Sequence, residues 1–178
     1  MFSFLYAQNE RKQIRMLNHI TTNQCRMLLQ KANFIKTQYP KRIKEFQQIL
    51  QDDRSLIEMS VDISAKISAT KGSGGKMKDL EAERIKNQVL IRNLKTEILY
   101  MDNQLLQIKI LENMMIRLKS KQVKCIEETY FKRNNPVEIC KKLYISRSAY
   151  YRYLNKGIDE LTKLYNHNIS SEEEENRK

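Results

Sequence analysis

Helix-breaking residues are scarce in this chain, whose 178 residues include only two prolines and four glycines. Proline and glycine are the residues that most disfavour a helix interior, whereas Lys, Glu, Gln, Leu, Ile and Met, which dominate here, favour it. The sequence therefore predicts an all-α protein in which the few breakers mark the ends of helices.

Two of these breaks divide the first half of the chain. Pro40 is expected to end a first helix near Tyr39, because the residue before a proline is disfavoured in the α conformation. The glycine cluster at residues 71–76 is expected to be a flexible hinge. A phosphate-binding loop is excluded, since Thr70 stands where that motif requires glycine and Met77 where it requires Ser or Thr.

A heptad pattern follows the glycine cluster. Apolar residues recur in steps of three and four at Ile91, Leu94, Ile98, Met101, Leu105 and Ile108. A helix over residues 77–120 would be about 65 Å long, and it cannot bury such a seam alone. The seam is expected to pack on residues 41–68 as an antiparallel hairpin, because the glycine cluster stands where the turn would lie. A homo-oligomer through the 91–118 seam is a second possibility, and the two arrangements do not exclude each other.

Residues 135–154 have the spacing of two helices joined by a tight turn. Asn135 can cap the first helix, Pro136 suits its first position, and Glu138 completes a capping box. Ser146 can cap the second helix. The buried stripe of that second helix is expected to comprise Tyr150, Leu154, Gly157 or Ile158, and Leu161.

The opposite face of the second helix carries residues that suit DNA. Arg bonds guanine and Asn bonds adenine in a bidentate manner, whereas Lys neutralises phosphate. We expect base contacts from Arg147, Ser148, Tyr151, Arg152 and Asn155. We expect phosphate contacts from Lys141, Lys142, Ser146 and Lys156. The alternative interpretation is the solvated face of an ordinary surface helix.

The stretch from Glu138 to Arg152 resembles region four of bacterial sigma factors, most closely the ArpU and RinA types of phage regulator from Gram-positive hosts. That family has a Glu-Ile-Ala helix followed by a Ser-Arg recognition helix. Two positions depart from it, with Cys140 for alanine and Tyr144 for the glycine of the turn. If position 144 is left-handed, a side chain there costs about 1–2 kcal/mol. The resemblance, fair over residues 120–165, implies a phage or prophage regulator that binds double-stranded DNA, with host RNA polymerase as a further partner.

Charge agrees with a nucleic-acid partner. The net charge is +12, and residues 117–163 alone hold twelve Lys or Arg against five Asp or Glu. A basic surface of this kind is the electrostatic mark of nucleic-acid binding. The alternative is a lysine-rich composition that produces a solvated surface without a partner.

Other chemistries have little support in the sequence. Three cysteines (Cys25, Cys125 and Cys140) and two histidines (His19 and His167) lack metal-ligand spacing, so no metal or cofactor is expected. No pair of carboxylates or nucleophile with a base stands out, so the chain is not expected to be an enzyme. No apolar run approaches the roughly 18 residues that cross a bilayer. Reduced thiols indicate a cytoplasmic protein, and DNA binding would make it nucleoid-associated.

Three functions remain open: a transcriptional regulator, a DNA-packaging protein of the small terminase kind, or a helical adaptor or oligomerisation protein that does not bind DNA. The terminase class usually has its DNA-binding motif near the N-terminus, unlike this chain. The expected parts are N-terminal helices (1–70), a hinge (71–76), a long heptad-bearing helix (77–119), a helix-turn-helix domain (120–168) and a disordered acidic tail (169–178). The N-terminal parts would thus form a long helical hairpin or coiled-coil arm before a C-terminal helix-turn-helix.

Overall fold

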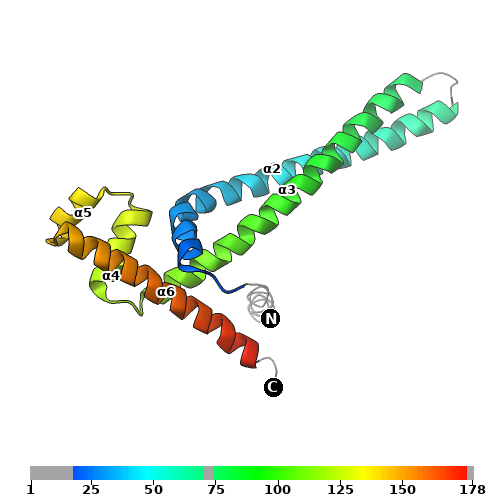
Figure 1. Ribbon diagram of the computed structural model, residues 1–178. Coiled ribbons are helices and arrows are strands. Elements are labelled where there is room, and N and C mark those ends of the chain that lie inside the picture. The colour runs from blue at the N-terminus through cyan, green and yellow to red at the C-terminus, as the bar shows by residue number, and fades with distance from the viewer. Residues whose placement is uncertain (1–17, 70–73, 176–178) are drawn as a thin grey trace, which may run out of the picture. The chain divides into compact units, whose positions relative to one another are not determined.

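The structure is a computed structural model that describes residues 18–69 and 74–175, with side chains for 18–62 and 78–171. Its elements are α2 (Thr22–Ala69), α3 (Gly74–Met115), α4 (Ser120–Ile126), the π-helical turn η1 (Glu127–Phe131), α5 (Pro136–Leu143) and α6 (Arg147–Glu175) (Figure 1). The described residues contain no strand, which confirms the all-α prediction.

The described residues form two compact units. Unit 1 consists of residues 18–36 and 103–175, and unit 2 consists of residues 37–102. Residues 18–36 therefore pack with the C-terminal elements, although the sequence pattern groups them with an N-terminal region. The physical reason is the apolar face of α2, where Cys25, Leu29 and Ala32 are fully buried in the core of unit 1.

The core of unit 1 is built around α6. Its buried stripe recurs in steps of three and four, as predicted for one face of a helix, at Tyr150, Leu154, Gly157, Ile158, Leu161 and Tyr165. Ile139 of α5, Ile126 of α4 and Leu111 of α3 belong to the same cluster of fully buried side chains. One face of α6 is thus buried along most of its length, and the opposite face is exposed.

Helices α4 and α6 approach each other closely at Gly157. A Cβ atom at Gly157 would lie 3.1 Å from Cβ of Gln122 and 3.1 Å from Cδ1 of Ile126. Gln122 is buried, and its amide donates a hydrogen bond of 2.8 Å to the Glu160 carboxylate. Its carbonyl oxygen accepts from the backbone N–H of Lys119 at 2.8 Å, at the start of α4. The glycine lets the helices approach, and Gln122 joins them.

The segment before α2 is fixed to α6 by reciprocal hydrogen bonds. The backbone N–H of Ile20 donates to Oδ1 of Asn166, and Nδ2 of Asn166 donates to the carbonyl of Ile20, both at 2.9 Å. A capping box then starts α2: Thr21 Oγ1 accepts from the Gln24 N–H, and Gln24 Oε1 accepts from the Thr21 N–H. These bonds set where α2 enters unit 1.

Unit 2 is an antiparallel hairpin of α2 and α3. The hydroxyl of Tyr39 donates to Asp102 at 3.0 Å, and Nε of Arg42 donates to Glu97 at 3.1 Å, so the helices run in opposite directions. The seam residues Leu94 and Met101 are buried. The hairpin expected from the heptads is therefore observed, and these seam residues are covered within the chain rather than left for a second copy.

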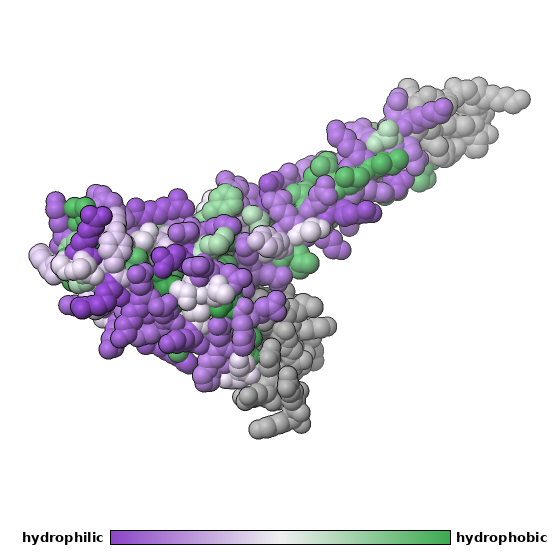
Figure 2. Space-filling view, in the orientation of Figure 1, coloured by the Kyte–Doolittle hydropathy of each residue, from purple (hydrophilic) through white to green (hydrophobic). Residues whose placement is uncertain are grey.

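Apolar side chains also remain exposed on this hairpin. They are Ile57, Met59, Val61, Ile85, Val89, Leu90, Leu99 and Tyr100, and Figure 2 shows apolar surface along it. Ile57 and Val61 are 38% and 62% exposed, although they share the helical spacing of an apolar face. The hairpin buries a narrower stripe than the sequence pattern predicts.

The prediction that Pro40 ends a helix is wrong, because α2 continues through it. A proline inside a helix removes the hydrogen bond to the carbonyl four residues earlier, here Lys36, at a cost of about 3 kcal/mol. Apolar packing on both sides of Pro40, at Ile35 and in the hairpin, offsets this cost. The boundary between the two compact units falls immediately after Lys36.

The other expected boundaries shift as well. Residues 74–76 of the expected hinge form the start of α3, and residues 70–73 lie outside the described residues. The tail expected to be disordered from residue 169 is helical to Glu175, because Ile169 is buried and glutamate favours helix. Residues 176–178 lie outside the described residues. None of the helices described is both long enough and apolar enough to cross a membrane.

Candidate nucleic-acid interface

The turn between α5 and α6 is set by its capping residues. Oδ1 of Asn135 accepts the N–H of Glu138 at 2.9 Å at the start of α5. At its end the N–H of Ile145 donates to the Cys140 carbonyl at 3.1 Å. Oγ of Ser146 accepts the N–H of Ala149 at 3.2 Å and caps α6. The two caps inferred from the sequence, Asn135 and Ser146, are therefore confirmed.

Tyr144 closes α5 in the left-handed conformation, with φ 52° and ψ 49°. This is the position where the sigma-like family has glycine, and a residue with a Cβ costs about 1–2 kcal/mol there. The side chain is 95% exposed, so it gains little packing in return. The turn thus retains the conformation that glycine favours despite the change of residue.

The face of α6 opposite the core is exposed and rich in donors. All six residues predicted on it are exposed: Arg147, Ser148, Tyr151, Arg152, Asn155 and Lys156. The Arg147 guanidinium lies 5.9 Å from the ring centre of Tyr151, and that of Arg152 lies 5.6 Å from the ring centre of Tyr153. Such cation–π contacts restrain long side chains. The face therefore presents two oriented guanidinium groups.

The predicted phosphate contacts have different environments. Lys141, Lys156 and Ser146 are exposed, and the hydroxyl of Ser146 also lies 3.1 Å from that of Ser148. Lys142 instead forms a 2.7 Å ion pair with Glu128, although its side chain is still 54% exposed. Lys142 therefore has a structural partner that the sequence pattern did not indicate.

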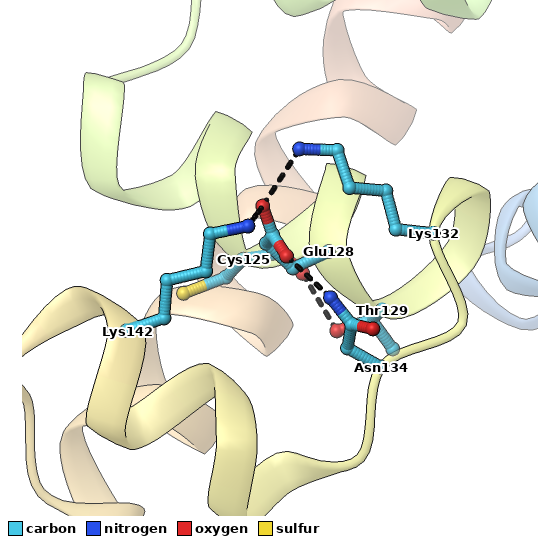
Figure 3. A network of polar contacts seen from close by, with 6 residues as sticks. All are labelled: Cys125, Glu128, Thr129, Lys132, Asn134 and Lys142. Atoms are coloured by element: carbon cyan, nitrogen blue, oxygen red, sulfur yellow. Dashed lines mark hydrogen bonds and ion pairs between the residues drawn. The ribbon is translucent and has the colours of Figure 1, made fainter.

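Glu128 is a buried carboxylate at the centre of a polar network (Figure 3). Its side chain is only 5% exposed. One carboxylate oxygen accepts from Lys132 at 2.8 Å and from Lys142 at 2.7 Å, and the other accepts from Asn134 at 2.6 Å. The hydrogen bonds from Lys132 and Lys142 lower the pKa of Glu128 to about 2. The network joins η1, the following loop and α5.

Sequence reasoning also missed Arg26. Its Nη2 donates to Oδ1 of Asn155 at 3.2 Å, although the two residues are 129 positions apart. Nothing local to Arg26 in the sequence marks it, since the contact depends on α2 packing beside α6. One residue of the predicted base-reading set, Asn155, thus has its carboxamide oxygen bonded within the protein.

Burial keeps two of the three cysteine thiols, Cys25 and Cys125, protonated. Burial raises the pKa of the Cys125 thiol to about 11, with a further contribution from nearby Cys140, and burial also raises that of Cys25. Protonated thiols are poor metal ligands and poor nucleophiles. Within residues 18–69 and 74–175, no group of three or more His, Cys, Asp or Glu is placed to hold a metal ion.

A family model described as "Protein of unknown function (DUF1492)" matches residues 62–162, which is more than half of the chain. The match includes the last eight residues of α2, all of α3, α4, η1 and α5, and the first half of α6. No match was found among the curated proteins or among the solved structures.

Proposed function

The chain belongs to the DUF1492 family, and we propose that it is a sequence-specific DNA-binding regulator of transcription. In this proposal it activates phage or prophage late genes from the bacterial cytoplasm. It binds double-stranded DNA through α6 and acts together with host RNA polymerase. The resemblance of residues 138–152 to region four of sigma factors supports the polymerase partner.

One observation carries the proposal: α6 is buried on one face and exposes six polar or basic residues on the other. A recognition helix needs this division, because its core face must be held while its outer face enters a major groove about 12 Å wide. The caps at Asn135 and Ser146 set the angle between α5 and α6. The rigid turn therefore supports a face suited to base edges.

The proposed contacts divide by chemistry. Arg147 and Arg152 present the planar donors that match guanine, and Tyr151, Ser148 and Asn155 supply the remaining base contacts. Lys141, Lys156 and Ser146 bind phosphates beside the groove. Lys142 holds Glu128 and, with a side chain that is 54% exposed, adds positive potential toward the DNA backbone. In this scheme the protein is a binding protein without catalytic residues, metal or cofactor.

A homo-oligomer through the 91–118 seam is not part of this proposal. Leu94, Met101, Ile108 and Leu111 of that seam are buried within the chain. A second copy would have to displace them or use another face of the hairpin.

The experiment is a titration of fluorescent duplex DNA from upstream promoters with the full chain, with and without RNA polymerase. Specific binding that strengthens with polymerase is expected, and the apparent affinity should fall steeply with salt because bound phosphates release counterions. The control is Lys95→Ala, which deletes one exposed positive charge on the hairpin rather than on α6. This variant should bind DNA like the wild type. Absence of binding at low salt contradicts the proposal, and ring formation in light scattering indicates a packaging protein instead.

A further inference from the structure

Arg26 extends the proposed interface beyond α5 and α6. It lies on α2, and its guanidinium donates to the carboxamide oxygen of Asn155 at 3.2 Å. Its Nε is buried and has no hydrogen-bond partner. The side chain is thus partly enclosed in unit 1, and the Nη2 end of its guanidinium reaches the exposed face of α6.

The position of Arg26 is fixed by the packing of α2. Its neighbour Cys25 and the nearby Leu29 are fully buried in the same core as α6. The bonds between Ile20 and Asn166 fix the segment just before it. The backbone at Arg26 is therefore held beside α6 by the packing of α2.

We propose that Arg26 is a specificity-determining residue of the DNA interface, which fixes the Asn155 carboxamide so that its amide N–H groups face the DNA. This inference rests on the proposed function. A guanidinium has donors only, so only the oxygen of the carboxamide can face Arg26. The contact therefore selects one of the two orientations that an asparagine amide can adopt.

The orientation changes which bases Asn155 can read. Asparagine recognises adenine with two bonds, because its amide donates to N7 and its oxygen accepts from the N6 amino group. With the oxygen held by Arg26, the amide still donates to N7, which adenine and guanine share. The native pair therefore discriminates little between adenine and guanine at this position, because its oxygen cannot accept from the N6 amino group that only adenine presents.

The test is selection of bound duplexes from a random pool by four full-length proteins: wild type, Arg26→Met, Asn155→Ala and the double variant. Asn155→Ala identifies the operator position that Asn155 contacts, because base preference should be lost at that position alone. At that position the wild type should accept adenine and guanine about equally. Arg26→Met frees the oxygen and should favour adenine at least about fivefold, the lower end of what a bidentate pair contributes. The double variant should match Asn155→Ala.

Arg26→Lys is the conservative control. Its ammonium keeps a donor toward Asn155, so the wild-type preference should return. Thermal unfolding of each variant separates lost folding from changed preference, since a merely structural Arg26 would lower stability and leave the preference at this one position unchanged.

Two results overturn the inference while leaving the proposed function intact. In the first, Arg26→Met keeps the wild-type base preference at the operator position assigned to Asn155. The other is an affinity loss in Arg26→Met that is equal for all sequences. If the wild type selects no sequence at all, the proposed function fails and the inference fails with it.

Discussion

Nζ of Lys142 lies 2.7 Å from Oε1 of Glu128, so the end of α5 is bonded to a buried carboxylate fourteen residues upstream. Two lysines and Asn134 converge on this one group. The orientation of α5, and with it the turn that leads into α6, therefore depends on a residue outside both helices.

Replacement of this carboxylate should destabilise unit 1. Glu128→Gln removes the charge that Lys132 and Lys142 share, and hydrogen bonds between charged groups contribute about 1.5–3 kcal/mol each. We expect a loss of about 2 kcal/mol in the free energy of unfolding, measured by urea denaturation. Glu127→Gln, a change of the same kind at the adjacent residue, should cost much less. Equal effects of the two would contradict the assigned role.

Glu128 should also give the protein a distinct acid dependence. Its pKa is lowered from 4.5 to about 2, so the folded state favours the ionised form. The resulting stabilisation is present above pH 4.5 and is lost as the pH falls from there toward 2. The stability difference between wild type and Glu128→Gln should stay constant from pH 7 to 5 and shrink below pH 4.5. A difference that grows in acid would refute this assignment.

Tyr144→Gly should stabilise the turn. The residue occupies φ 52° and is almost fully exposed, so glycine relieves strain without loss of packing. The gain expected is about 1 kcal/mol, read from the shift in urea midpoint. Tyr144→Ala retains a Cβ and should give none of it. A glycine variant that unfolds earlier than wild type would show that the tyrosine ring stabilises the turn.

Gly157→Val should weaken the crossing of α4 and α6. A Cβ there would already lie 3.1 Å from Gln122 and Ile126, and overpacking of a close contact costs about 1–3 kcal/mol. Lys163→Val places the same residue on an exposed position of α6, where only helix propensity changes, by a few tenths of a kcal/mol. Similar melting temperatures for the two variants would contradict a tight crossing at Gly157.

Local signals in the sequence predicted much of the C-terminal part. The Asn135 and Ser146 caps and the stripe from Tyr150 to Leu161 depend on residues within one or two helical turns, and all of them are found as predicted. The hairpin followed from a heptad repeat and from the glycines where its turn was expected. These features can be predicted from the sequence because helical periodicity and capping involve residues that are close together in the chain.

Features that depend on tertiary packing were not predictable in the same way. Pro40 has the sequence signature of a helix end, yet packing on both sides keeps α2 continuous. Asn166 bonds Ile20, Lys142 bonds Glu128 and Arg26 bonds Asn155 across 146, 14 and 129 positions. No spacing rule links such pairs, so the partners of the candidate site residues emerge only from the fold.

The most direct test of the central claim, that the exposed face of α6 reads DNA sequence, is selection from a random duplex pool with Arg152→Ala and Lys141→Ala beside the wild type. Arg152→Ala should lose about 1–3 kcal/mol of discrimination at one position of the operator. Lys141→Ala should keep the wild-type motif and weaken all sequences about equally. A wild type that enriches no motif, or two variants with the same profile, would contradict the account.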